Sequence, residues 1–489
     1  MHPPRHGDDE TDPRMKILMA TAEYAPLAKT GGLADAVTGL ARALSDRGHD
    51  VRVLLPRYAE ARTAPVSTVG RAAGAEILEV RRLDADESAS PRVYLADAPE
   101  LASSASIYAG DERDAASFIR LSRAALELGK ALGWRPDVLH CHDWHTALVP
   151  ALAEARGSDR RATLLTVHNL GYQGIFGEQV LAANAAAELE PLRAQRERTQ
   201  HTVNFLDLGI RFADAITTVS PTYAREIQRP ELGMGLDETL RARGDALTGI
   251  LNGVDYRLWS PETDSFLGAH FTREATDGKG LVKRALEAEL GLPPGDGPLI
   301  GCVTRLVWQK GIDVLAAALP ALLDATAARF ALLGSGEPEL ETALADLARR
   351  HPARIAFRRG YDEGLAHRIL AGSDFVLVPS RYEPCGLTQL YALRYGTIPI
   401  VRATGGLADS VRHFDASAGT GNGSVFEHAD VGGILWGVTT ALGWYADAEA
   451  WRTLVDNAMA ADFSWAHQAP EYEALYERML SVSRRASRP

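Results

Sequence analysis

Two basic residues in the second half of the chain lie where a phosphate group could bind. Arg305 and Lys310 occur in the string RLVWQKG, just past the predicted strand 299–303. At the carboxyl end of a parallel strand, an Arg can bind phosphate oxygens in fork geometry and a Lys adds a compact positive charge. These residue types indicate a pyrophosphate site, although taken alone they fit a solvated turn equally well.

The stretch PSRYEPCGLTQLYALRYG places a carboxylate, Glu383, beside these cations. The predicted strand 375–378 precedes a loop with Glu383, and a helix is predicted from Gly386 that stops at Gly396. Because the first amides of a helix attract anions, we expect three backbone amides to face the same ligand as the cations: those of Gly386, Leu387 and Thr388. Beside a phosphate, Glu383 could accept hydrogen bonds from sugar hydroxyls. A helix-capping role is the simpler alternative, and the nearby cations make it the less favoured one.

The hexapeptide Thr-Gly-Gly-Leu-Ala-Asp occurs twice, at 30–35 and at 404–409. Each copy follows a predicted strand and opens a predicted helix. Paired glycines at a helix start expose backbone N–H groups, which predicts an anion-binding turn in each half of the chain. A tight turn that arose twice by chance is the alternative, and the equivalent positions of the two copies favour the functional interpretation.

The string HCHDWH, residues 140–145, looks at first like a metal-binding cluster. On a strand, His140 and His142 share one face and Cys141 lies on the other. Zinc ligands usually come from separated segments with spacings such as C-x-x-C, and nothing similar recurs, so we expect no metal site. A polar cluster at a strand end is the favoured interpretation, and His168, after the predicted strand 163–167, is a candidate for the same edge.

Two further patterns carry little weight. Asp84-Ala85-Asp86 resembles a metal-binding DxD string but lies in a predicted hairpin loop. Gly334-Ser335-Gly336 begins like a dinucleotide fingerprint, yet Glu339 stands where the last Gly of G-x-G-x-x-G is required, so nicotinamide binding is poorly supported.

Short apolar strands alternate with amphipathic helices along the chain, which predicts parallel sheets covered by helices. The predicted strands are 16–19, 51–55, 93–95, 138–140, 163–167, 215–219, 299–303, 330–333, 355–357, 375–378 and 398–401. Predicted helices include 34–47, 116–133 and 386–395. A break at 259–262 divides two α/β halves of similar size. Ligands of such sheets bind beyond the carboxyl ends of the strands, where the motifs above lie.

Length and charge restrict the class of protein. A chain of 489 residues exceeds one domain at roughly 100–200 residues each. With 52 Lys plus Arg against 64 Asp plus Glu, the net charge of −12 argues against a protein that coats nucleic acid or an anionic membrane. Three Cys and no targeting segment suit a reducing cytoplasm. Residues 431–446 carry no charge but fall short of the roughly 20 residues of a membrane span, so we expect a buried helix.

Taken in order, the motifs resemble those of bacterial and plant-type glycogen and starch synthases, which are retaining glucosyltransferases. The resemblance covers residues 15–480. It rests on the strings AKTGGLADAV, HCHDWHT, TVHNLGYQGIF, ADAITTVSPTYAREI, GILNGVD, RLVWQKGID, EPCGLTQ, TGGLADSV and DFSWAHQAPEYEALYERML. The combination of K-T-G-G-L with E-P-C-G-L-T-Q is its most specific part.

The resemblance implies an α/β GT-B fold, with two Rossmann-like domains facing across a deep cleft. The expected parts are a disordered tail (1–14), an acceptor-side domain (15–258), a nucleotide-sugar domain (259–464), and a helix with a basic tail (465–489) that crosses back to the first domain. It implies ADP-glucose as donor and the non-reducing 4-OH of an α-1,4-glucan, glycogen, as acceptor. It implies no metal or other cofactor, and neither nucleic acid nor membrane as partner.

Residue roles follow from the same resemblance. The residues implied in catalysis are Lys29, Asp143, His168, Arg305, Lys310 and Glu383. Of these, the three cations would meet the diphosphate, Glu383 the glucose hydroxyls, and the other two the reacting centre. The donor pocket would share the cations and add Gly31, Gly32, Asn252, Cys385, Gly386, Leu387, Thr388, Tyr391, Thr404, Gly405 and Gly406. Asp35 would help to orient the first Gly-Gly loop.

Some positions depart from related transferases. Tyr391 stands where many of them carry a second Glu, as an aromatic does in the synthase subgroup. Asp207-Leu208 replaces the usual Lys-Gly, and the segment 108–118 looks shortened; both are expected in first-domain loops where the glucan docks. Three alternatives stay open: a synthase that prefers UDP-glucose, a GT-B epimerase, and a non-enzymatic polysaccharide-binding module. The K-T-G-G-L motif disfavours the epimerase, and the phosphate-binding residues disfavour the binding module.

Overall fold

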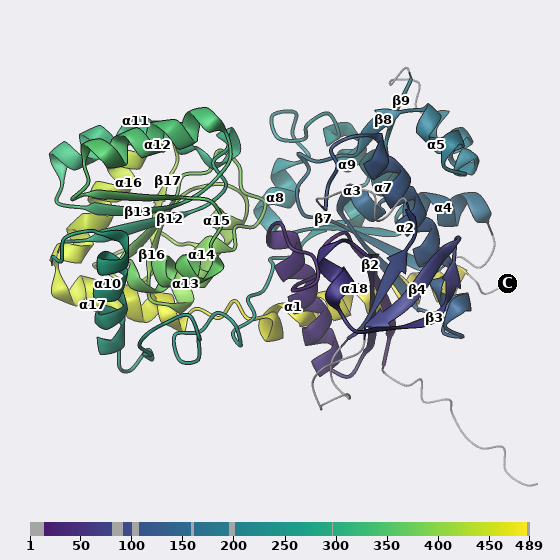
Figure 1. Cartoon of the computed structure of the whole chain (residues 1–489), viewed down its shortest axis with the longest axis horizontal. Coiled ribbons are helices and arrows are strands. Elements are labelled where there is room, and N and C mark those ends of the chain that lie inside the picture. The colour runs from purple at the N-terminus through teal and green to yellow at the C-terminus, as the bar shows by residue number, and fades with distance from the viewer. Residues whose placement is uncertain are drawn as a thin grey trace, which may run out of the picture. The chain divides into compact units, whose positions relative to one another are not determined.

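The computed structural model describes residues 14–80, 91–99, 107–157, 161–194, 201–295 and 297–486. Contacts divide the chain into two compact units, seen in Figure 1. Unit 1 takes the described residues of Met1–Thr217, Thr239–Leu247 and Ala469–Pro489, and unit 2 takes those of Thr218–Glu238 and Thr248–Gln468. Two α/β domains with parallel sheets were expected, and this is confirmed. The string Asp84-Ala85-Asp86 lies outside the described residues.

A nine-stranded sheet lies mainly in unit 1, in the order β11-β10-β7-β6-β1-β2-β5-β4-β3. Its strands are β1 (Lys16–Ala20), β2 (Asp50–Pro56), β3 (Val66–Ala72), β4 (Ala75–Val80), β5 (Arg92–Asp97), β6 (Val138–His142), β7 (Ala162–Val167), β10 (Ala215–Thr218) and β11 (Leu247–Gly249). The central strands β5, β2, β1, β6 and β7 pair in parallel, whereas β3 and β4 are antiparallel. The chain order reverses between β1 and β6, which is the topological switch point of such a sheet.

The sheet of unit 2 is parallel throughout, in the order β14-β13-β12-β15-β16-β17. Its strands are β12 (Leu299–Val303), β13 (Arg329–Gly334), β14 (Ile355–Arg359), β15 (Phe375–Val378), β16 (Ile398–Arg402) and β17 (Ser424–Phe426). The order is that of a doubly wound dinucleotide-type sheet, and its switch point lies between β12 and β15.

Helices connect most of these strands. From the first half of the chain they are α1 (Gly32–Asp46), α2 (Glu112–Ala131), α3 (Asp143–Thr146), α4 (Leu148–Arg156), α5 (Gln179–Ala183), α6 (Glu190–Ala194), α7 (Phe205–Phe212), α8 (Pro221–Glu226) and α9 (Asp237–Ala242). From the second half they are α10 (Asp277–Leu290), α11 (Ile312–Ala325), α12 (Pro338–Arg350), α13 (Glu363–Gly372), α14 (Thr388–Arg394), α15 (Gly405–Ser410), α16 (Val431–Ala446), α17 (Ala448–Ala460) and α18 (Trp465–Ala486).

Both faces of the unit 2 sheet are covered by helices. Figure 1 shows α11, α12 and α16 on one face and α10, α13 and α14 on the other. On the first face, Leu319, Leu344 and Val438 pack with Phe330 of β13 in one apolar cluster. The segment 431–446 is therefore a helix, as predicted, but only the face with Ile434 and Val438 is buried, and Trp436 is 50% exposed. None of the helices described has the length and apolar character needed to cross a membrane.

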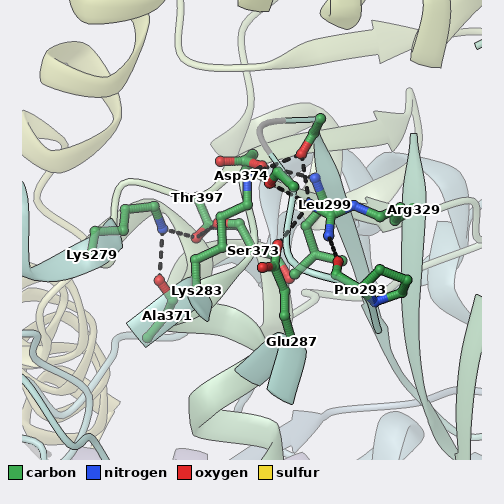
Figure 2. A network of polar contacts seen from close by, with 12 residues as sticks. Lys279, Lys283, Glu287, Pro293, Leu299, Arg329, Ala371, Ser373, Asp374 and Thr397 are labelled. Carbon is green, nitrogen blue, oxygen red and sulfur yellow. Dashed lines mark hydrogen bonds and ion pairs between the residues drawn. The ribbon is translucent and has the colours of Figure 1, made fainter. Parts of the chain in front are cut away.

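A polar network joins the amino ends of the unit 2 strands, at the opposite end of the sheet from the motifs (Figure 2). Lys283 Nζ lies 2.6 Å from Asp374 Oδ2, which also accepts the Leu299 amide at 2.8 Å. Arg329, at the start of β13, forms an ion pair with Glu287 at 2.6 Å. Because buried charges are stable only when they are paired, we interpret this end of the sheet as structural.

The predicted strands match observed ones within two residues at each end. The short or edge strands β3, β4, β11 and β17, and the two-stranded sheet of β8 (Ile175–Gly177) and β9 (Thr202–Asn204), were missed. β3 and β4 form an antiparallel pair with a register shift between Thr68 and Gly70, so their apolar positions do not make one continuous run.

The observed units differ from the predicted boundaries. Residues 218–238 and 248–258 were placed in the first domain but belong to unit 2. The reason is hydrogen bonding, because Ser220 Oγ donates to the carbonyl of Pro384 at 2.7 Å. At the other end of the chain, residues from Ala469 onward belong to unit 1, where Tyr476 Oη lies 2.8 Å from His140 Nδ1. The helix α18 continues to Ala486 through much of the expected basic tail.

Two predicted loops are helices. Asp207 and Leu208 lie in α7, whose first turn is capped by Asn204 accepting the Asp207 amide at 3.0 Å. Leu208 is buried, so it faces the core and not a glucan. Most of segment 108–118 forms the start of α2, where Phe118 is buried with its ring centroid 4.9 Å from that of Trp144.

Candidate functional site

A small pocket opens at the switch point of the unit 2 sheet. It is formed by the ends of β12 and β15 and by the start of α14. Its lining residues are Cys302, Val303, Thr304, Lys310, Leu377, Val378, Pro379, Ser380, Glu383, Gly386, Leu387 and Thr388. The structure therefore brings together one predicted cation, the predicted carboxylate and the three residues whose amides were expected to face a ligand.

Lys310 and Glu383 form an ion pair in this pocket. Lys310 Nζ lies 2.8 Å from Glu383 Oε1 and 2.6 Å from Oε2, and Ser380 Oγ donates to Oε2 at 2.8 Å. Glu383 is only 5% exposed, so its charge needs these partners. An anionic ligand would have to share Lys310 with Glu383. Ser380 was not predicted as a site residue, although a hydroxyl group three residues before Glu383 in the same loop could have indicated a hydrogen bond between the two.

The helix beside the pocket begins two residues later than predicted. α14 begins at Thr388, and Gly386 has a φ of +71°. A side chain at position 386 would be strained in this conformation and would meet Gln389, with Cβ 2.4 Å from Oε1. The buried Gln389 Nε2 donates to the carbonyl of Cys385 at 3.1 Å. Gln389 thus fixes the loop through a backbone carbonyl group, while Gly386, Leu387 and Thr388 line the pocket.

The second Thr-Gly-Gly-Leu-Ala-Asp turn packs against the backbone of the Glu383 loop. A Cβ on Gly405 would lie 1.9 Å from the carbonyl oxygen of Glu383, and one on Gly406 would lie 2.1 Å from that of Cys385. The Gly406 amide donates to the Glu383 carbonyl at 3.0 Å, and the Gly405 amide donates to the Glu226 carboxylate at 3.1 Å. Protein oxygens therefore already accept these two amides, so a ligand anion could bind them only by replacing a protein acceptor.

The other predicted donor-pocket residues lie apart from the pocket lining. Arg305 is exposed beyond the end of β12. Tyr391 is buried, with its ring stacked on Trp259 at 3.8 Å between centroids. Burial raises the pKa of the Cys385 thiol to about 12, while hydrogen bonds from Asn252 act in the opposite direction. Thr404, which was also predicted, immediately precedes α15, and its Oγ1 donates to Glu226 at 3.1 Å instead of capping the helix.

In unit 1, Asp143 and His168 are in direct contact. Asp143 Oδ1 accepts the His168 amide at 2.6 Å and the Asn169 amide at 3.3 Å. Asp143 has a φ of +55°, a conformation that is uncommon outside glycine and is often found at functional sites. Burial raises its pKa to about 7, and the two amides act against this shift. The carboxyl group therefore titrates near neutral pH.

The histidines of unit 1 form a hydrogen-bonded cluster. His168 Nε2 lies 3.1 Å from His142 Nδ1, and His140 Nε2 lies 2.6 Å from Thr166 Oγ1. Burial lowers the pKa values of His140 and His168 to about 3, so both rings are neutral at pH 7. In the described part of the chain, no group of three or more His, Cys, Asp or Glu side chains is arranged to hold a metal ion.

The first Thr-Gly-Gly-Leu-Ala-Asp turn also holds a carboxylate of the protein itself. Glu23, 3% exposed, accepts the Thr30 amide at 2.8 Å, the Gly31 amide at 3.2 Å and Thr30 Oγ1 at 2.7 Å. The amides of Thr30 and Gly31 therefore already have a carboxylate acceptor within the protein. Lys29 Nζ lies 3.0 Å from Asp35 Oδ1, so Asp35 contacts the preceding cation. Gly32 begins α1 and is exposed.

Sequence reasoning missed both carboxylates that bind these turns, Glu23 and Glu226. The signal for Glu23 was an acidic residue three positions after the strand β1. Glu226 carried no such signal, because it is 179 positions from Gly405.

Comparison with known proteins assigns both halves of the chain. Residues 16–242 match the starch synthase catalytic domain family, and residues 297–441 match the family of glycosyl transferases group 1. A glycogen synthase of Anaeromyxobacter dehalogenans (strain 2CP-C) is 47% identical, over 95% of this chain and 100% of the relative. A glycogen synthase of Rhodospirillum rubrum is 42% identical, over 95% and 99% respectively.

Solved structures agree with these sequence relatives. The catalytic domain of starch synthase IV from Arabidopsis thaliana, bound to ADP and acarbose, matches with a TM-score of 0.87 and 36% identity, over 96% of this chain and 100% of that one. A sucrose-phosphate synthase from Thermosynechococcus elongatus matches with a TM-score of 0.63 at 19% identity, which shows a shared fold alone.

Proposed function

The chain belongs to the family of glycogen and starch synthases, which are glycosyltransferases, and we propose that it transfers glucose from ADP-glucose to the non-reducing 4-OH of an α-1,4-glucan with retention of configuration. The observation that carries this proposal is the pocket at the β12–β15 switch point. There a cation and a carboxylate, Lys310 and Glu383, lie beside the start of α14. A nucleotide sugar needs both kinds of group, one for its phosphates and one for its hydroxyls.

The proposed donor site follows from the charges of this pocket. Lys310 and the backbone at Gly386, Leu387 and Thr388 bind the diphosphate, and the Glu383 carboxylate accepts hydrogen bonds from the glucose hydroxyls. The Arabidopsis starch synthase structure is bound to ADP, which is the nucleotide that this proposal requires. The exposed Arg305 adds a second positive charge beyond the strand end.

The chemistry is governed by charge that develops on the leaving group. The bond between glucose C1 and the phosphate oxygen breaks, and ADP leaves with the electron pair. The acceptor 4-OH bonds to C1 on the same face, and its proton passes to the leaving phosphate. Cations placed at the diphosphate stabilise the transition state more than the ground state, since negative charge increases there as the bond breaks.

We assign the residues of unit 1 to the reacting centre and the acceptor. Asp143 has a carboxyl group that titrates near neutral pH, and His168 has a neutral ring, so both can exchange hydrogen bonds with sugar hydroxyls without a fixed charge. Lys29 is assigned to the donor phosphates. To bind them it would have to break its ion pair with Asp35 or bind both groups at once.

The transfer is proposed to need no metal or cofactor, and the protein is proposed to act in the cytoplasm.

One assay tests the proposal. Purified protein is incubated with glycogen and either ADP-glucose or UDP-glucose, with EDTA or without it, and nucleotide release and chain growth are followed. We expect chain growth from ADP-glucose that EDTA does not reduce. Preference for UDP-glucose would support the alternative donor, and nucleotide release without chain growth would support hydrolysis or epimerisation. No release from either donor would support the binding module.

A further inference from the structure

The helix α8 contacts both segments that shape the donor pocket. It follows β10 in the chain, within the string SPTYAREI to which no role was assigned. Ser220, which is fully buried, caps the helix and donates from Oγ to the Pro384 carbonyl at 2.7 Å. At the other end of the helix, Glu226 accepts the Gly405 amide at 3.1 Å through both carboxylate oxygens.

Consecutive amides of one turn join Glu226 to Glu383. The Gly405 amide donates to the Glu226 carboxylate, and the next amide, of Gly406, donates to the Glu383 carbonyl at 3.0 Å. Thr404 Oγ1 adds a second hydrogen bond to Glu226 at 3.1 Å. Because a Cβ on Gly405 would lie 1.9 Å from the Glu383 carbonyl oxygen, the turn and the loop have no room to move toward each other. A shift of the turn would therefore displace the backbone of Glu383.

Charge explains why this acceptor is a carboxylate. An amide and a hydroxyl donate to it, and Arg402 interacts with it electrostatically, which counteracts the lowering of the Arg402 pKa by burial. A carboxylate offers acceptor sites only, so it satisfies these donors with no competing N–H group.

We propose that Glu226 is a positioning residue: through the Gly405–Gly406 turn it fixes the loop that presents Glu383 to the donor sugar. This inference rests on the proposed function for the identity of the sugar. The positioning itself is a property of the loop and can be measured without substrate. Ser220 holds the same loop at Pro384 and is expected to contribute in the same direction.

The test compares four full-length variants with the wild type. Glu226→Ala removes the acceptor, Glu226→Gln keeps one acceptor oxygen, and Ser220→Ala removes the second attachment. Glu231→Ala is the matched control, because Glu231 is an exposed carboxylate in the same segment. Each variant is measured for kcat and KM with ADP-glucose, for ADP affinity by calorimetry, and for amide hydrogen exchange of the segment 382–387.

We expect Glu226→Ala to lower kcat by roughly 10- to 100-fold, the usual effect of removing a partner of a functional side chain. Exchange in 382–387 should become faster, while ADP affinity stays close to that of the wild type, because Glu383 is assigned to the sugar and not to the diphosphate. Glu226→Gln should recover most of the activity, and Glu231→Ala should match the wild type.

Wild-type kcat and wild-type exchange in Glu226→Ala would overturn the inference. The inference would also be overturned if Glu226→Ala lost activity only in proportion to its unfolded fraction and Glu226→Gln lost the same amount. If Glu226→Ala does not fold, the test rests on amide hydrogen exchange of the segment 382–387 in Glu226→Gln and Ser220→Ala. Exchange that is unchanged in both variants would then overturn the inference. If the wild type uses neither nucleotide sugar, the proposed function fails, while the exchange measurements still decide whether Glu226 positions the loop.

Discussion

The two Thr-Gly-Gly-Leu-Ala-Asp turns have the same sequence but different surroundings. In unit 1, a Cβ added to Gly31 would meet no described atom within 4 Å, whereas in unit 2 a Cβ on Gly405 would lie 1.9 Å from the Glu383 carbonyl oxygen. The last residues differ as well, because Asp35 pairs with Lys29 while Asp409 accepts the Thr222 amide at 2.7 Å. Glycine is thus required by packing in the second turn and leaves open space at the first. Identical residues serve two physical purposes.

The largest difference is expected from alanine at the second position of each turn. Gly405→Ala should destabilise unit 2 by more than about 3 kcal/mol, because the methyl group would overlap the Glu383 carbonyl and φ is +44°. Calorimetric unfolding measures this effect. Gly31→Ala is the matched control and should stay within about 0.5 kcal/mol of the wild type, since Gly31 is extended and its surroundings are open. Equal losses in both variants would break the comparison.

One cation in each unit, Lys310 and Lys29, is expected to matter for rate. Lys310→Ala and Lys29→Ala should each lower kcat by roughly 100- to 1,000-fold, because each removes a charge assigned to the diphosphate. Steady-state assays with ADP-glucose measure this. Wild-type turnover in either variant would contradict that assignment, and it would show that only one of the two units supplies a catalytic cation.

The carboxylate of the first turn is expected to contribute to stability. Glu23→Ala leaves the amides of Thr30 and Gly31 and the hydroxyl of Tyr108 without their charged acceptor, which should cost about 1–3 kcal/mol. Denaturant unfolding measures the loss. Glu23→Gln, which keeps the shape and one acceptor oxygen, should lose less. An unchanged unfolding free energy in Glu23→Ala would mean that water replaces the carboxylate without cost.

The last expected effect concerns pH, and it involves Glu23, the carboxylate that binds the first turn. Burial raises the pKa of Asp143 to about 7, and the charge of Glu23 adds to this shift. A carboxyl group with a raised native pKa keeps its proton in the folded state, so its contribution to stability is lost as pH rises from about 4 through 7. Unfolding at the two pH values should therefore show that Asp143→Asn is more stable relative to the wild type at pH 8 than at pH 5, by roughly 2–3 kcal/mol.

The role of Glu23 in that titration can be measured directly. Glu23→Gln should lower the pKa of Asp143, as followed by NMR of the labelled carboxyl group, because a neutral side chain no longer disfavours its ionisation. An Asp143 pKa that does not change would mean that burial alone causes the shift.

Much of the fold was predictable because strand and helix signals are local. The strands 299–303 and 375–378 were placed without error, and the last residues of both line the pocket. Lys310 and Glu383 could be paired from the sequence, since parallel strands bring their carboxyl ends to one edge. The start of α14 was misplaced because the φ of +71° at Gly386 depends on contacts with Gln389. The boundary near 218 was misplaced because the partner of Ser220 is 164 residues away.

By itself, the sequence determined that this chain has two α/β units, each with a Gly-Gly turn at a strand end, and that it resembles glycogen and starch synthases. Only the tertiary structure decided what those turns bind. Glu23 reaches the first turn from 7 residues away, and Glu226 reaches the second from 179. Hydrogen bonds depend on positions in space, so the sequence of the repeated hexapeptide does not indicate which carboxylate will bind it in the folded protein.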